Sequence, residues 1–114
     1  VISFVATSYV PYVVIDALAV QKSDSSNGTT WSAAVDLCKQ SRVGGYSDWH
    51  LPSLSELTLM YTNRYEIGGF YTATYWSTTA SVSNHYVIDF SSGETKLLQS
   101  SYTKGRVRCV RTIN

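Results

Sequence analysis

The sequence has few of the residues that build metal sites or disulfide-rich scaffolds. Its 114 residues include only two Cys, two Pro and one Met. Cys38 and Cys109 belong to no CxxC motif, and neither His50 nor His85 lies at the spacing of zinc ligands, so no metal site is expected. A single disulfide between the two cysteines is the first interpretation, and it would place the chain in an extracellular or periplasmic compartment. The alternative is two buried free thiols in a cytosolic protein.

Long apolar runs and catalytic motifs are also missing. The apolar stretch Val1–Val20 is interrupted by polar residues and by Pro11, which argues against a membrane span or a signal peptide. The sequence contains no nucleophile elbow, no Gly-rich phosphate loop and no close pair of carboxylates. We therefore expect neither an enzyme nor a cofactor-binding protein.

The residues that are abundant favour a folded, β-rich protein. The composition is 44% hydrophobic, 13% aromatic and 15% charged, and it includes nine Tyr and three Trp. Aromatic and β-branched side chains suit the pleated surface of a sheet. We expect one ligand-binding domain over residues 1–114, of the α+β class, with a mainly antiparallel sheet and two short helices.

Charge is distributed unevenly along the chain, although the net charge is only +1. Residues 1–95 contain four basic and all eight acidic residues. From position 96 onward there is no acidic residue, and the five basic ones are Lys96, Lys104, Arg106, Arg108 and Arg111. This asymmetry indicates a localised surface for anions.

Two segments have the pattern of amphipathic helices. Trp31, Val35 and Cys38 follow helical spacing, with Thr29 or Thr30 available as the N-cap and a glycine pair at 44–45 to end the helix. In the second segment Ser53 precedes Glu56 by three residues, which is the capping-box pattern. Both helices are predicted to be structural.

The remaining segments alternate as strands do. Residues 21–30 are predicted to be a polar loop, and Ser91-Ser92-Gly93 is predicted to be the turn of an antiparallel hairpin. The predicted strands lie within residues 1–20 and at 71–80, 85–90, 94–99 and 106–113.

Five motifs in order carry a family resemblance: "GGYSDWHLPSLSEL", "NRYEIGGF", "YWSTT", "IDFSSGE" and "VRCVR". From about Trp31 to Arg111 the chain resembles the bacterial domain family named after the C-terminal domain of the Legionella collagen-like protein. The resemblance implies a C-type-lectin-like fold and a secreted or cell-surface ligand-binding module. The EPN, QPD and WND triplets of calcium-dependent lectins are missing, which argues against calcium-mediated sugar binding.

The name-giving protein of the family is a trimeric adhesin with a collagen-like stalk, and its C-terminal domain binds sulfated glycosaminoglycans. The resemblance therefore implies adhesion and biofilm formation, with a sulfated or other polyanionic glycan such as heparin as partner and a homotrimer as the assembly. Neither nucleic acid binding nor membrane insertion is expected.

The basic C-terminal strand is the predicted binding surface for this polyanion. A hairpin would bring Lys96, Lys104 and Arg106 together, and Arg111 is a further candidate that would reach water if the strand ended or bulged. Tyr102, next to Lys104, is the best aromatic candidate for a sugar contact, whereas Arg108 is expected to pair with a buried acid such as Asp48 or Asp89. The other aromatic candidates are Tyr46, Trp49, Tyr65, Tyr71, Tyr75, Trp76 and Tyr86, of which the tryptophans are expected in the core.

Two alternatives to glycan binding follow from the same residues. A receptor domain of a phage tail or of a diversified surface protein would contact a protein through loops such as Ser77–Tyr86 and Gln99–Thr103. A purely structural trimerisation cap would bind no ligand. Binding of a polyanion would weaken steeply with salt, which separates the first hypothesis from the others.

Overall fold

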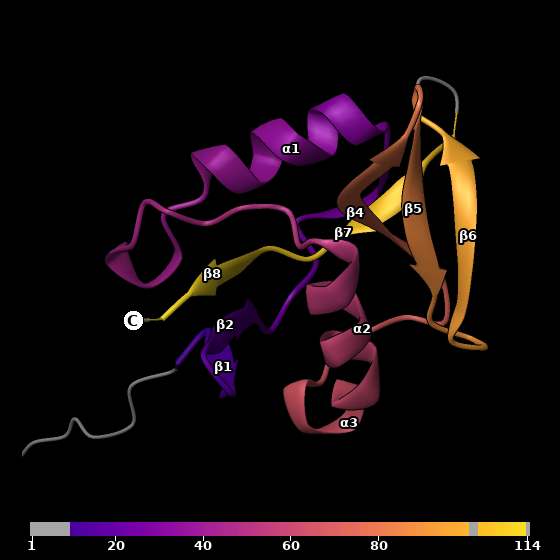
Figure 1. Cartoon of the computed structure of the whole chain (residues 1–114). Coiled ribbons are helices and arrows are strands. Elements are labelled where there is room, and N and C mark those ends of the chain that lie inside the picture. The colour runs from indigo at the N-terminus through magenta and orange to yellow at the C-terminus, as the bar shows by residue number, and fades with distance from the viewer. Residues whose placement is uncertain (1–9, 101–102, 114) are drawn as a thin grey trace, which may run out of the picture.

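A computed structural model describes residues 10–100 and 103–113, where eight strands form two sheets beside three short α-helices (Figure 1). The prediction of an α+β fold with mainly antiparallel strands is confirmed. Two helical turns were not predicted, namely α3 (Arg64–Ile67) and the 3-10 helix η1 (Val43–Gly45). Each is too short to show a hydrophobic period in the sequence.

The smaller sheet has three antiparallel strands in the order β1-β2-β8. They are β1 (Tyr12–Ile15), β2 (Leu18–Gln21) and β8 (Val110–Thr112). Central strand β2 is buried along its whole length, and its Val20 lies opposite Val13 on one side and Val110 on the other. The last strand of the chain, β8, therefore completes the sheet that the first two strands begin.

The larger sheet has five strands in the order β3-β7-β4-β5-β6. They are β3 (Ser26–Thr29), β7 (Gly105–Val107), β4 (Thr74–Ser81), β5 (Asn84–Asp89) and β6 (Glu94–Gln99). The predicted hairpin is confirmed, because β5 and β6 pair antiparallel and Gly93 takes a positive φ of 81° in the turn between them. Only the β4–β7 pair of this sheet is parallel among the described strands.

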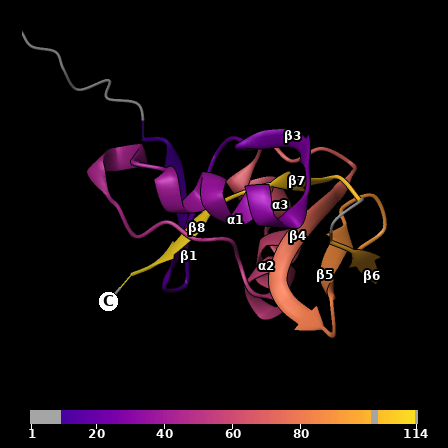
Figure 2. The same cartoon turned by 90° about the horizontal axis from the view of Figure 1, so that it is seen from above.

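Each face of the five-stranded sheet is covered by one helix. Tyr75 and Ile88 point into a cluster with Leu57 and Met60 of α2 (Leu54–Thr62). On the opposite face Trp76 packs in a cluster with side chains of α1 (Trp31–Gln40), which crosses β7 and β4 in Figure 2. Successive side chains of β4 point to opposite faces of the sheet, so each face has its own hydrophobic core.

The predicted helix caps have different outcomes. Thr30 is the N-cap residue of α1, but its side chain makes no capping hydrogen bond. In α2 the capping box is confirmed, because the Glu56 backbone N–H donates to Ser53 Oγ over 3.2 Å and the Ser53 N–H donates to the Glu56 carboxylate over 2.9 Å.

The predicted disulfide between Cys38 and Cys109 is confirmed. Cys38 on the last turns of α1 bonds to Cys109, with an S–S distance of 2.11 Å and a Cα–Cα distance of 5.4 Å. Both cysteines are fully buried in the α1 core. The bond ties α1 to the segment between β7 and β8.

Two predictions about the strands are wrong. The segment 21–30, expected to be a loop, contains β3, whose polar residues Ser26–Thr29 pair with β7. The segment 106–113, expected to be one strand, is divided into β7 and β8, which belong to different sheets. The chain leaves the five-stranded sheet after Val107 and enters the three-stranded sheet at Val110, and the side chains of Arg108 and Cys109 between them are buried.

Candidate ligand-binding site

Lys96 does not join the other C-terminal cations. It lies on β6, and its Nζ is 3.3 Å from Asp89 and 3.9 Å from Glu94. Register pairs Lys96 with Val87, on the Trp76 side of the sheet, whereas Arg106 pairs with Tyr75 on the other side. The prediction that Lys96 clusters with Arg106 is therefore wrong, because β4 and β5 separate their strands and their side chains leave opposite faces.

Arg111 is held in the smaller sheet. Its guanidinium donates to both oxygens of Asp48, over 2.6 and 3.2 Å, and lies 3.7 Å from the centroid of the Tyr46 ring. The hydrogen bond from Arg111 lowers the pKa of the Asp48 carboxyl. The break between β7 and β8 does let Arg111 reach the surface, but in a different sheet from Arg106.

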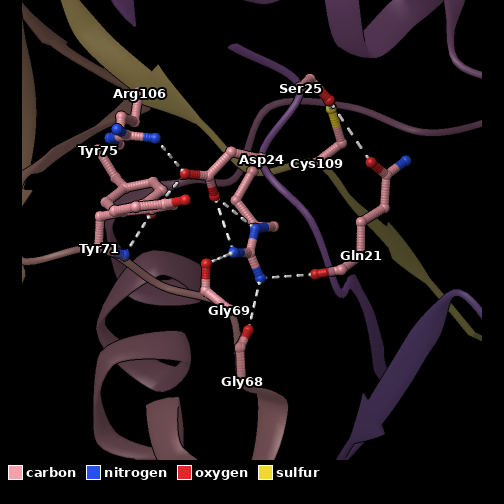
Figure 3. Close-up of polar contacts among 10 residues, drawn as sticks. Gln21, Asp24, Ser25, Gly68, Gly69, Tyr71, Tyr75, Arg106 and Cys109 are labelled. Carbon is pink, nitrogen blue, oxygen red and sulfur yellow. Dashed lines mark hydrogen bonds and ion pairs between the residues drawn. The ribbon is translucent and has the colours of Figure 1, made fainter. Parts of the chain in front are cut away.

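Arg108 is a buried arginine whose five N–H groups all have partners. Its Nε and Nη2 each lie 2.8 Å from the same oxygen of Asp24. Its Nη1 and Nη2 also donate to the backbone carbonyls of Gln21, Gly68 and Gly69, over 2.9, 3.0 and 2.7 Å (Figure 3). The expected buried acid exists, but it is Asp24 and neither Asp48 nor Asp89.

The same carboxylate also holds Arg106 and Tyr75. The second oxygen of Asp24 accepts from Arg106 Nη1 over 3.0 Å and from the Tyr75 hydroxyl over 2.7 Å (Figure 3). That hydroxyl in turn accepts from the Tyr71 backbone N–H over 3.0 Å. Burial is the largest cause that raises the pKa of Tyr75. The phenol therefore stays protonated and donates a hydrogen bond to Asp24.

This network lies beneath two adjoining surface hollows. One, of about 360 Å³, and the other, of about 270 Å³, share Gly69 and Tyr71 in their linings. We call them together the Tyr71 groove. The first is lined by Lys22, Ser23, Asp24, Ser26, Asn27 and Arg106, and the second by Arg64, Tyr65, Gly68, Phe70, Thr72, Phe90 and Ser91.

Two tyrosines and two arginines dominate the open surface of the groove. The side chain of Tyr65 is 86% exposed and that of Tyr71 is 59% exposed. Arg106 lies 3.9 Å from the centroid of the Tyr71 ring, and Arg64 lies 4.6 Å from that of Tyr65. Such pairs hold planar cations against aromatic faces at the protein surface.

Comparison with protein families agrees with the resemblance found in the sequence. The model of the Lcl C-terminal domain family matches residues 16–111, so the match begins earlier than the five motifs alone indicate. The chain belongs to this family. Among curated proteins, none matches the sequence.

The other two predicted site residues of this Lcl C-terminal domain are Lys104 and Tyr102. Lys104 is exposed immediately before β7, beside β3: a Cβ at Gly28 would lie 3.8 Å from the Lys104 Cβ. Lys104 makes no ion pair within the part of the chain that the structure describes, and Asn27, which precedes Gly28 in β3, lines the Tyr71 groove. Tyr102 lies outside the described residues.

Sequence reasoning identified part of this site. Arg106, Lys104 and the stacking tyrosines Tyr65 and Tyr71 were all candidates. Asp24 was missed, because nothing in a polar segment shows which of its residues will meet an arginine more than eighty positions later.

Among residues 10–100 and 103–113, no three His, Cys, Asp or Glu side chains lie close enough together to hold a metal ion. None of the helices in the described chain is long and apolar enough to span a membrane.

Proposed function

We propose that this Lcl C-terminal domain is a non-catalytic adhesion module that binds sulfated or other polyanionic glycans. The site is the Tyr71 groove and the adjoining Lys104, in place of a continuous basic C-terminal strand. The observation that carries the proposal is the free hydrogen-bonding capacity of Arg106 above an open polar hollow.

Arg106 has donors to spare. One of its N–H groups is used by Asp24, and the described structure contains no buried side-chain nitrogen or oxygen without a partner. The Nε and Nη2 groups of Arg106 have no partner among the described residues and are therefore not fully buried, in a side chain that is 19% exposed. A guanidinium presents paired donors that match the oxygens of a sulfate or carboxylate.

The electrostatic balance of the groove also favours anions. Asp24 is its lining carboxylate, and the side chain of Asp24 is only 7% exposed because Arg106 and the buried Arg108 enclose it. Lys22 and Arg64 line the groove as well. With the one acid already neutralised, the surface presents net positive charge to a ligand.

We further propose a secreted or cell-surface location and a homotrimer. The disulfide is typical of oxidising compartments, and the family is named after a collagen-like protein.

The trimer would use the edge strand β1. Val10 precedes this strand and is 48% exposed, and Val14 lies on it and is 51% exposed, so the two offer an apolar contact to another copy. Three copies would bind a repeating polymer with increased avidity. A single monomeric species in sedimentation equilibrium at micromolar concentration would contradict the trimer.

Heparin binding tests the proposed site. We expect Lys104→Ala/Arg106→Gln to weaken heparin binding at low salt by about tenfold, as the loss of two contacts to a charged ligand predicts. The matched control Lys39→Ala/Lys96→Ala removes the same amount of charge away from the groove and should bind nearly as the wild type does. Circular dichroism must show that all variants are folded. Equal losses in both double variants would contradict the site, and no binding by the wild type would contradict the function.

One observation favours the protein-receptor alternative. The interval Ser77–Tyr86, predicted to be a loop, consists mainly of β4 and β5, but its turn exposes Val82 by 99% with a positive φ of 58°. A β-branched residue in this region is strained. A protein partner bound there would respond to Val82→Ser and little to salt, whereas the glycan proposal predicts no effect of that change.

A further inference from the structure

We propose that Asn27 is a site of spontaneous deamidation in the folded protein, and that the carboxylate formed there weakens anion binding in the Tyr71 groove. The reaction itself does not depend on what the groove binds, whereas its effect on affinity rests on the proposed function. The sequence Asn27-Gly28 lies on β3, and Asn27 lines the larger hollow together with Arg106.

The reaction needs only Asn27, the residue that follows it and water. The backbone nitrogen of Gly28 attacks the side-chain carbonyl carbon of Asn27, so that a C–N bond forms and the bond from that carbon to Nδ2 breaks. Nδ2 leaves as ammonia with the proton that Gly28 gives up. Water then opens the cyclic succinimide at either carbonyl and leaves an aspartate or an isoaspartate, which is ionised at neutral pH. No electrons are exchanged, so the reaction requires no oxidant or reductant.

Glycine is the following residue that hinders this attack least. It has no side chain to shield its nitrogen, and its backbone reaches conformations that other residues avoid. Apart from its neighbours in the chain, a Cβ at position 28 would have only the Cβ of Lys104 within 4 Å, at 3.8 Å. The surroundings of Gly28 are therefore open enough for the ring to form.

The pairing of edge strand β3 is irregular at these two residues. β3 pairs with β7 at Ser26 and at Thr29, and the register shifts between them. The matching interval of β7, Gly105–Val107, is one position shorter, so β3 has an extra residue, as in a β-bulge. The Gly28 N–H donates to the Ser26 hydroxyl over 3.1 Å, and this side chain can rotate away from the attacking nitrogen.

The other described asparagines are held more firmly. Asn63 donates from Nδ2 to the Leu59 carbonyl over 2.9 Å, and Asn84 lies in the regular pairing of β5 with β6. Each is followed by a residue with a large side chain. Asn27 is exposed, and its amide makes no hydrogen bond within the described part of the chain. Asn27 is therefore the asparagine that we expect to react first.

A carboxylate at position 27 would change the electrostatic balance of the larger hollow. Asp24 is the one acid in its lining, and Arg106 and Arg108 enclose that acid. A second acid would be exposed on the same hollow as Arg106 and next to Gly28, which lies beside Lys104. It would reduce the positive potential that attracts an anion to this surface.

Peptide mapping by mass spectrometry measures the reaction. Trypsin releases Asn27, Asn63 and Asn84 in separate peptides, residues 23–39, 43–64 and 65–96, and each asparagine is the only amide side chain of its peptide. The folded protein is incubated at mildly alkaline pH beside a sample in urea. We expect the folded protein to lose the Asn27 amide at a rate similar to that in urea, while Asn63 and Asn84 keep theirs. The rate should rise with pH, because hydroxide removes the proton of the attacking nitrogen.

Two substitutions at this exposed position connect the reaction with binding. Asn27→Gln keeps an amide, but its longer side chain would have to close a larger ring, so this matched control resists the reaction. Asn27→Asp carries the product charge from the start, and it should bind heparin at low salt about fivefold more weakly than Asn27→Gln does. Incubated wild type should lose affinity in step with its converted fraction, whereas incubated Asn27→Gln should not.

The results separate the reaction from the function. An Asn27 amide that persists in the folded protein while it is lost in urea would overturn the proposal, because the fold would then protect this site. Equal heparin affinity of Asn27→Asp and Asn27→Gln would overturn it as well. If fresh wild type binds no heparin, the proposed function fails and the effect on affinity fails with it, whereas peptide mapping still decides whether Asn27 reacts.

Discussion

At the scale of single residues, Asp24 and Arg108 organise the site. One carboxylate receives hydrogen bonds from Arg106, Arg108 and Tyr75, and Arg108 extends the network to three backbone carbonyls. Buried charges are tolerated only when paired and fully hydrogen-bonded, and this pair meets both conditions. We therefore expect Asp24 and Arg108 to hold the walls of the groove in place and not to contact a ligand.

Replacing Arg108 tests this role. We expect Arg108→Met to lower the free energy of unfolding by about 3–5 kcal/mol, because it removes the buried ion pair to one Asp24 oxygen together with the hydrogen bonds to the carbonyls of Gln21, Gly68 and Gly69. Urea denaturation followed by fluorescence measures the change. Arg111→Met, which breaks the more exposed pair with Asp48, is the control and should have a much smaller effect. Similar small losses in both variants would show that the buried network does not stabilise the fold.

At the scale of elements, the sequence predicted helices and strands well where the whole pattern that specifies them lies within a few neighbouring residues. The capping box at Ser53 and Glu56 begins α2, and the predicted strand 94–99 coincides with β6. Strand β3 could not be predicted, because Ser26–Thr29 has no apolar alternation and pairs only because β7 lies beside it. The division of the last strand was also hidden, since it depends on the distant partner of Arg108.

The contact between α1 and the β5–β6 hairpin provides a pH-dependent element. The His85 ring on β5 stacks on Trp31 of α1 with 3.6 Å between centroids, and its Nδ1 contacts Ser100 Oγ. Burial lowers the pKa of His85 below its usual 6.5. Between the two pKa values the unfolded chain binds more protons than the folded one, so this contribution to stability is complete above about pH 6.5 and is lost as the pH falls further.

This pH dependence can be measured directly. We expect the NMR titration of the His85 imidazole in the folded protein to have its midpoint below 6.5, and the melting temperature to fall between pH 7 and pH 5 by more in the wild type than in His85→Gln. The lowered pKa values of Asp48 and Asp89 act in a separate window, since their contributions are lost only below about pH 3.8. A midpoint at or above 6.5 would contradict the assignment.

At the scale of the whole molecule, the charge asymmetry of the sequence has a structural explanation. The acids of the first part of the chain pair with the cations of the last: Asp24 with Arg106 and Arg108, Asp48 with Arg111, and Asp89 with Lys96. Most of the basic tail is therefore neutralised in the fold. Sequence position alone overstated the binding surface, because it showed the cations without their partners.

The two cations of the tail that are not fully neutralised lie at or beside the Tyr71 groove. Arg106 keeps N–H groups without a protein partner, and Lys104 is exposed next to β3, while Arg64 lines the smaller hollow. The glycan-binding site that we propose is therefore this group of residues and not the whole basic tail.

The measurement that tests this account most directly is the affinity for heparin over a salt series from 50 to 200 mM, for the wild type and for Lys104→Ala/Arg106→Gln. We expect wild-type affinity to fall by about tenfold or more across the series, by analogy with the counterion release known for nucleic acids. The variant should bind more weakly with a shallower salt dependence. Wild-type affinity that does not change with salt, or a variant with the same slope and affinity as the wild type, would contradict the claim that this groove binds polyanionic glycans.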